Sequence, residues 1–338
     1  MNITFRPAML DNQPTATTAA CKICGNAENN RLHEAREMAF GLRDKFTYLE
    51  CGACGCLQLL NIPADMARYY PGDYYSLQVH GKLMTFVRHQ WSAYGFHGHN
   101  AVGRAFSSVF YEPYAMQAIR RADVAKTARI LDVGCGSGRL LLDLKYLGFE
   151  NLHGADPFIP HDIKYEGGPT VFKREIAAMD GKYDLIMFNY SFEHMDRQAE
   201  VLSQVRRLLA ADGKVIVRIP VASSYGWRHY GVNWFGLDAP RHFYLHTFKS
   251  MELLAKNCGL RIVSTVQEGS HATIWLSELY ARDIAGNAPE AISASRPLKW
   301  IPTLLFGNIR AAKAKARELN RNNDGDMVSF QLGRAAQE

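Results

Sequence analysis

The sequence predicts an α/β protein built around a doubly wound, mostly parallel sheet. Three observations support this prediction. Short apolar runs of strand length alternate with apolar-periodic helical stretches beyond residue 128, a glycine-rich turn follows the first run, and an acidic residue follows the second. With 338 residues, of which 47% are hydrophobic, the chain is long enough for one large α/β domain and a smaller attached module.

Seven strands are expected in the sheet, with helices between them. The strands are predicted at 129–133, 152–155, 170–172, 184–190, 214–219, 261–263 and 327–330. Helices are predicted at 139–147 and 196–209. Sheets of this kind bind their ligands at the carboxyl ends of the strands, so the loops that follow the strands are expected to border one crevice.

A glycine turn links the first strand to its helix, in the pattern D-x-G-x-G-x-G from Asp132 to Gly138. Its glycines allow a sharp turn and leave no Cβ where a ligand approaches, and the following helix points free N–H groups at the same space. Asp156, after the second strand, stands close to where such folds bind ribose hydroxyls. The residues alone leave open a dinucleotide site and a turn without a ligand, although the glycine spacing differs from the dinucleotide fingerprint.

The stretch resembles the first motif of Rossmann-like (class I) S-adenosylmethionine-dependent methyltransferases. The resemblance implies that S-adenosylmethionine is the cofactor and that the last strand of the sheet runs antiparallel. We expect the cofactor-binding residues around the turn and after the second and fourth strands: Asp132, Gly134, Cys135, Gly136, Gly138, Asp156, Asn189 and Ser191.

Two Cys-x-x-Cys-Gly motifs lie near the N-terminus, at Cys21/Cys24 and Cys51/Cys54, and 26 residues separate them. Each motif places two thiolates about one turn apart before a glycine, and two such knuckles make a tetrahedral Cys₄ site. We therefore predict a structural zinc ion, with Cys56 outside the ligand set. Four thiolates leave no open position for catalysis. A redox pair and reduced core cysteines are the alternatives.

The cysteine module carries no net charge, because five basic and five acidic residues balance between residues 21 and 60. A module that tracks phosphates would be basic, so nucleic acid is not the expected partner. We interpret the module as a zinc-stapled platform.

Five segments are predicted along the chain. They are a flexible tail at 1–20, a zinc-ribbon-like module at 21–62, an aromatic-rich helical connector at 63–128, the methyltransferase core at 129–268 and 325–334, and a helical insertion at 269–324. Tyrosines of the connector, at 69–75, either line a substrate entrance or cover the sheet edge. The sequence shows no secretory signal and no apolar run of membrane-spanning length, so the cytoplasm is the expected compartment.

Two segments after the fourth and fifth strands are expected to carry the chemistry. Glu193-His194 follows the fourth strand; such a pair is typical of a broad methyltransferase subgroup, with helix capping as the alternative role of Glu193. His242 and His194 are candidate bases for the acceptor proton, because imidazole titrates near neutrality. The candidate substrate contacts are Trp234, Tyr244 and Arg241, the last as an anchor for phosphate or carboxylate.

The resemblance covers most of the chain, including the cysteine module and the Pro-Arg-His segment at 240–242. Similar zinc-ribbon methyltransferases are associated with bacterial sugar and surface-polysaccharide pathways. The resemblance implies O- or C-methylation of a small-molecule or lipid-linked, sugar-type acceptor, although the long C-terminal substrate domain of sugar C-methyltransferases is not seen here. The alternatives are an RNA methyltransferase and a non-catalytic subunit that keeps the fold.

Residues 299–321 combine an apolar stretch with six basic residues and one acidic residue. Such a segment either lies on an anionic membrane surface or forms a solvated helix over the sheet. Peripheral membrane contact through this segment is therefore a second hypothesis about partners.

Overall fold

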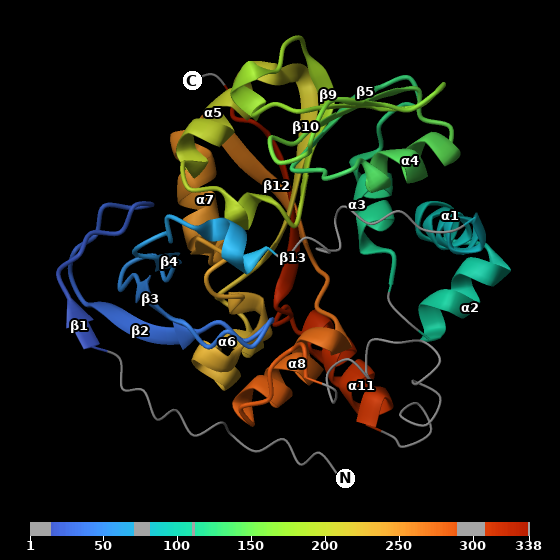
Figure 1. Ribbon diagram of the computed structural model, residues 1–338. Coiled ribbons are helices and arrows are strands. Elements are labelled where there is room, and N and C mark those ends of the chain that lie inside the picture. Colours follow the sequence, from blue (N-terminus) through green and yellow to red (C-terminus); the bar gives the residue numbers. More distant parts are fainter. Residues whose placement is uncertain (1–14, 71–81, 110–111, 289–307, 337–338) are drawn as a thin grey trace.

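The computed structural model describes residues 15–70, 82–109, 112–288 and 308–336, which form two sheets with helices around them (Figure 1). The larger sheet has eight strands in the order β12 (Leu260–Gln267), β13 (Met327–Arg334), β10 (Leu209–Pro220), β9 (Tyr183–Asn189), β5 (Arg129–Val133), β6 (Asn151–Ala155), β8 (Thr170–Phe172) and β7 (Ile163–Lys164). The smaller sheet has five strands in the order β1 (Thr15–Thr17), β2 (Asn30–Arg36), β3 (Lys45–Glu50), β4 (Leu57–Leu59) and β11 (Tyr244–Leu245).

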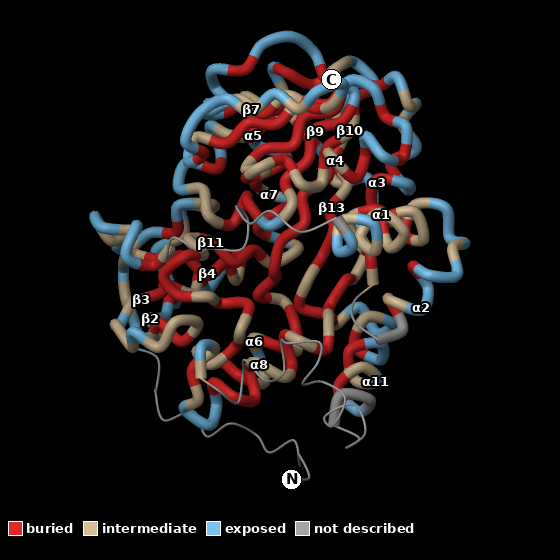
Figure 2. The backbone as a smooth tube through the Cα atoms, turned by 45° about the vertical axis from the view of Figure 1, so that its right-hand side comes forward, coloured by how far each residue is buried: buried red, intermediate tan, exposed pale blue. Residues whose placement is uncertain are grey.

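The larger sheet is mixed, with a parallel centre. Strands β5, β6, β8, β9 and β10 run parallel, whereas β13 lies antiparallel between β10 and β12. The structure confirms the doubly wound sheet, the seven predicted strands and the antiparallel last strand. It adds β7, a two-residue strand that pairs with β8. The central strands are buried on both faces, as their nearly continuous apolar sequences require (Figure 2).

Helices cover both faces of this sheet. They are α3 (Tyr114–Ala122) and α4 (Arg139–Tyr146) on one face, and α5 (Gln198–Leu208) and α7 (Phe248–Asn257) on the other. Successive strand residues point to opposite faces, so Ile130 joins the core under α3 while Leu131 joins the core under α5. Two further helices, α1 (Lys82–His97) and α2 (Ala101–Val109), lie on the opposite side of the large sheet from the small one (Figure 1).

The smaller sheet contains the cysteine module and extends beyond its predicted limits at both ends. Thr15–Thr17 pair antiparallel with β2, so the N-terminal residues 15–17 are a strand rather than part of a loose tail. At the other edge, β11 pairs antiparallel with β4. Since β11 comes from the segment predicted to face the acceptor, this pairing joins the N-terminal module to the core.

Among the described residues between β12 and β13 are two helices, α8 (His271–Ala281) and α11 (Asn308–Arg321). The apolar face of α11, with Ala316 and Leu319, packs against Ile274 of α8. The amphipathic pattern of α11 is thereby accounted for by packing. The apolar stretch at 299–306 lies outside the described residues. No helix within the described ranges has the length and hydropathy needed to cross a membrane.

Candidate active site and zinc site

The glycine turn lies between β5 and α4, and its three glycines all have positive φ: 71° at Gly134, 55° at Gly136 and 79° at Gly138. A Cβ on Gly134 would lie 2.5 Å from Cβ of Ser191, and one on Gly138 would lie 2.6 Å from Cγ2 of Val171. The first and last glycines are thus required by the backbone conformation and by protein packing. The expectation that all three make room for a ligand therefore needs correction.

Asp156 follows β6 and fastens the turn to the neighbouring strand. Its Oδ2 accepts a hydrogen bond from the N–H of Gly136 at 2.8 Å, and its Oδ1 accepts one from the N–H of Phe158 at 2.9 Å. Each carboxylate oxygen has a further lone pair, so ribose hydroxyls remain possible partners. The residue predicted to bind the cofactor also shapes the loop that would hold it.

Asp132 is a buried carboxylate beside the turn, with 2% of its surface exposed. Its Oδ1 has no hydrogen-bond partner among the described residues. Burial, and then the charge of Asp156, raise the pKa of Asp132 to about 8, while Arg218 opposes the shift. A cation in the crevice would stabilise the charged carboxylate, and S-adenosylmethionine carries both an ammonium and a sulfonium. The unpaired carboxyl group of Asp132 therefore fits a site for this cationic cofactor.

A polar row crosses the carboxyl edge of the sheet on the same face as Asp132. Asn189 of β9 lies beside Arg218 of β10 in register, and the Arg218 guanidinium donates a hydrogen bond to Asn189 Oδ1. The same guanidinium donates from Nε to Glu268 Oε2 at 2.7 Å. Asn189 therefore has one side-chain oxygen engaged by the protein, which the sequence did not indicate.

The loop after β9 connects the glycine turn to the predicted catalytic segment. Ser191 Oγ donates a hydrogen bond to the Val133 carbonyl at 2.6 Å. Two residues later, Glu193 and His194 form the 3-10 turn η4 (Phe192–His194). The N–H of Phe243 bonds to the Glu193 carbonyl at 2.8 Å. The two segments predicted to border one crevice are therefore in contact.

His194 and His242 lie together, with ring centroids 4.7 Å apart. Each donates Nδ1–H to a backbone carbonyl at 2.8 Å, His242 to Gly236 and His194 to Arg241, in the tautomer that these bonds require. Both Nε2 atoms therefore keep a lone pair. His242 Nε2 lies 3.9 Å from Oε1 of Glu193, a fully buried carboxylate whose Oε2 has no partner in the described part of the chain.

Burial lowers the pKa of both histidines. The pKa of His194 falls to about 3, with the charge of His242 as a second cause. For His242, Asp238 and the carbonyl of Gly236 oppose the effect of burial. Burial also raises the pKa of Glu193 to about 8. Among these groups, His242 lies beside Asp238, whose charge would stabilise a proton taken from an acceptor.

Comparison with known proteins identifies the segment that contains these features. Residues 110–265, a range that includes α3 and ends within β12, match the family model described as a methyltransferase domain. This segment is therefore a methyltransferase domain. No curated protein matches the chain.

Solved structures resemble the methyltransferase only distantly. The O-methyltransferase of a polyketide synthase from Brevibacillus brevis, solved with S-adenosyl-L-homocysteine, is 14% identical, with 77% of this chain and 82% of that one covered and a TM-score of 0.42. A cyclopropane synthase from Mycobacterium tuberculosis is 15% identical, with 66% and 84% covered and a TM-score of 0.42.

The three residues predicted to contact substrate occupy packing positions in the methyltransferase. Arg241 is 1% exposed, with carboxylates of Asp238 and Glu37 at 2.6 and 3.0 Å. Trp234 is 1% exposed, and its Nε1–H donates to Asp326. Tyr244 is 3% exposed and packs in the core of the cysteine module. The placement of Arg241 argues against an anchor for a substrate anion, because its charge is already neutralised.

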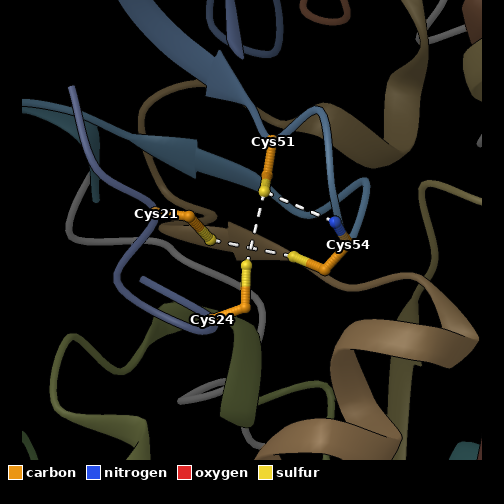
Figure 3. A group of neighbouring side chains, drawn as sticks. All are labelled: Cys21, Cys24, Cys51 and Cys54. Carbon is orange, nitrogen blue, oxygen red and sulfur yellow. Dashed lines mark hydrogen bonds between the residues drawn. The ribbon is translucent and has the colours of Figure 1, made fainter. Parts of the chain in front are cut away.

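The four predicted zinc ligands converge from two knuckles (Figure 3). The Sγ atoms of Cys21 and Cys54 are 3.7 Å apart, and those of Cys24 and Cys51 are 3.5 Å apart. A tetrahedron of zinc–sulfur bonds of about 2.3 Å has edges of about 3.8 Å, so the sulfurs already stand close to coordination distance. Backbone N–H groups of Ile23 and Cys54 point at sulfurs at 3.4 Å. The residues fit a Cys₄ zinc site.

Several residues near His194 and His242 were not predicted. Glu37 pairs with Arg241 from the cysteine module, and Tyr70 OH lies 3.2 Å from Nδ1 of His194. Tyr70 belongs to the tyrosine-rich segment predicted to line the entrance or cover the sheet edge; residues 71–81 of that segment lie outside the described ranges. The buried acid Glu37 has no motif around it, so no local signal reveals its partner 204 residues away.

Proposed function

We propose that the enzyme transfers the methyl group of S-adenosylmethionine to a small-molecule or lipid-linked, sugar-type acceptor, and that His242 removes the acceptor proton. The observation that carries this proposal is the free Nε2 of His242, held by the Nδ1 bond to Gly236 and flanked by Glu193 and Asp238 at 3.9 and 3.8 Å. The sulfonium of the cofactor is a strong electrophile, so the protein needs mainly to align and deprotonate the acceptor. An O–H or an acidified C–H acceptor fits this arrangement.

The sugar-type acceptor is favoured over RNA by charge. The cysteine module has no net charge, and its carboxylates pair within the protein, as Glu37 does with Arg241 and Glu50 with His33. A nucleic-acid-binding module would leave basic residues free to neutralise phosphates. The resemblance to sugar-associated methyltransferases supports the same choice.

We also propose that the Cys₄ site holds a structural zinc ion, as the sulfur spacing supports. When bound, zinc would join the two knuckles by four thiolate bonds and stabilise the module. Four reduced thiolates suit a reducing compartment, which is consistent with a cytoplasmic enzyme. Elemental analysis should find about one zinc per chain in the wild type and less in Cys54→Ser; full occupancy in a Cys21→Ser/Cys24→Ser variant would refute the assignment.

A labelled-methyl screen tests the acceptor. The purified enzyme with radiolabelled S-adenosylmethionine should label nucleotide sugars or lipid-linked sugars, and His242→Gln should not. Labelling of RNA in place of sugars would overturn the acceptor class. Cofactor binding without labelling of any sugar, lipid-linked sugar or RNA would favour a non-catalytic subunit.

A further inference from the structure

The cysteine module and the segment 234–247, which we call the catalytic loop, share one sheet through the pairing of β4 with β11, and they share the buried ion pair of Glu37 with Arg241. We propose that the cysteine module builds the acceptor side of the active site, and that Glu37 is a positioning residue that holds His242 in place through Arg241. The proposal deepens the proposed function, since it rests on His242 as the base. It gives the module a role in catalysis other than recognition of nucleic acid or of a protein partner.

Glu37 directly follows β2 and has none of its surface exposed. Its two oxygens accept hydrogen bonds from the N–H groups of Phe40 and Leu42, both at 2.9 Å. Oε1 also lies 3.0 Å from Nη2 of Arg241. A fully buried carboxylate is costly unless it is paired, and here the partner belongs to the catalytic loop rather than to the module.

Arg241, which Glu37 binds, also binds the turn that contains His242. Its Nε and Nη2 donate to the two oxygens of Asp238 at 2.9 and 2.6 Å, and Nη1 donates to the Tyr69 carbonyl at 3.2 Å. The carbonyl of Asp238 in turn accepts from the N–H groups of Arg241 and His242 at 2.8 and 3.3 Å. A bidentate guanidinium fixes the angle between its partners, so the turn has little freedom.

A second group of contacts binds the same turn to the module. Tyr48 of β3, fully buried, donates its hydroxyl to the His242 carbonyl at 2.8 Å. Just beyond β11, Thr247 donates its hydroxyl to the carbonyl of Cys54, a predicted zinc ligand, at 2.6 Å. The catalytic histidine is therefore held from the module at its backbone, while its ring bonds to Gly236.

The charge of Glu37 should affect the pKa of His242, because Glu37 pairs with Arg241 and Arg241 lies near the imidazole. The groups that face the ring are Glu193 and His194 from η4 and Asp238 and Arg241 from its own loop. After burial, the charge of Arg241 also lowers the pKa of His242, whereas Asp238 raises it. Glu37 offsets Arg241, so removing its charge should lower the pKa of His242 further.

Glu37→Gln tests the proposal, because it removes the charge and nearly preserves the shape. We expect kcat to fall by on the order of 10², the effect of a small misplacement of a reacting group. The acidic limb of the rate profile should move to lower pH, while the Kd for S-adenosylmethionine and the zinc content stay unchanged. The matched control is Glu34→Gln on the same strand, whose carboxylate pairs with Lys45 inside the module at 2.8 Å and should behave as wild type.

A double variant and a second single variant complete the test. Glu37→Gln/Arg241→Gln removes both charges, so the acidic limb should return toward its wild-type position. The proposal is overturned if Glu37→Gln keeps wild-type kcat and pH profile, or if it loses zinc and cofactor affinity together with kcat. Should Glu37→Gln fail to fold, Tyr48→Phe removes only the hydroxyl bond to His242, and an unchanged kcat there overturns the proposal as well.

His242→Gln separates this proposal from the one on which it rests. If the acidic limb persists in His242→Gln, the base assignment fails. If the limb vanishes there while Glu37→Gln matches the wild type, the base assignment stands and only the positioning role fails.

Discussion

The proposed cofactor side and the proposed acceptor side of the site are constructed in different ways. The proposed cofactor side uses two consecutive strand–loop units, joined by the hydrogen bond from the Gly136 N–H to Asp156, 20 residues away. The acceptor side is assembled from side chains of separate segments, joined across 204 residues between Glu37 and Arg241. The first is a local device that a short motif specifies, and the second depends on two sheets meeting correctly. A substitution on one side should therefore impair that side and leave the other side intact.

The largest expected effect is the loss of the base. His242→Gln should lower turnover by roughly 10² to 10⁴ while leaving the affinity for S-adenosylmethionine nearly unchanged. Because burial lowers the pKa of His242, the wild-type rate should decline only at a pH below the usual imidazole range, and this limb should vanish in the variant. Rate profiles and calorimetry measure both. If His194→Gln removes the limb while His242→Gln keeps it, the two roles are exchanged.

A cofactor-side substitution should give the opposite pattern. Asp156→Ala removes the acceptor of two backbone hydrogen bonds, at 2.8 and 2.9 Å, as well as the expected ribose contact. We expect S-adenosylmethionine to bind more weakly by about 2–3 kcal/mol, with kcat at saturation close to wild type. Asp184→Asn is the matched control. The carboxylate of Asp184 also accepts a backbone hydrogen bond, from the N–H of Arg129, but at the opposite end of β5 from the glycine turn. Equal calorimetric affinities for wild type and Asp156→Ala would place the cofactor elsewhere.

A proton-linked effect should sharpen the assignment of Asp132. In the free protein its pKa of about 8 keeps the carboxyl neutral below that pH. A bound cation lowers this pKa, so binding of S-adenosylmethionine should release up to one proton below pH 8, and the affinity should rise with pH until about 8 and then level off. Calorimetry in buffers of different ionisation enthalpy detects the proton. Asp132→Asn should abolish the release, and persistent release in that variant would contradict the assignment.

The smallest effect is expected at the rim of the contact between module and core. Lys249 Nζ donates to the Ala53 carbonyl at 2.7 Å from an exposed position. Because exposed contacts contribute little, Lys249→Met should change the free energy of unfolding by less than about 0.5 kcal/mol and kcat by less than about twofold. Chemical denaturation and initial rates measure both. A large loss of kcat would mean that the rim, and not only the buried Glu37–Arg241 pair, positions the loop.

The difference between local and long-range contacts also explains which features could be predicted from the sequence. The alternation of apolar runs predicted the large sheet because strand and helix periods are local signals. The cysteine motifs likewise predicted four sulfurs that the structure brings together. The five-stranded sheet was not predicted, since the two residues of β11 pair with β4 only through the tertiary fold. The placement of Arg241 was not predicted for a related reason: an arginine that bonds two carboxylates of the protein has the same local sequence as one that binds a substrate.

The pairing of β4 with β11 also has a consequence for biosynthesis. The four predicted zinc ligands all precede residue 60, so the two knuckles could capture the proposed zinc ion as soon as they leave the ribosome. The edge of β4 then stays unpaired until β11 is synthesised, because Tyr244 follows its partner Gln58 by 186 residues. At roughly 5–20 residues per second, this interval lasts on the order of 10–40 s. The N-terminal module, with its proposed zinc ion, would thus serve the nascent chain as a template onto which the segment around β11 folds later.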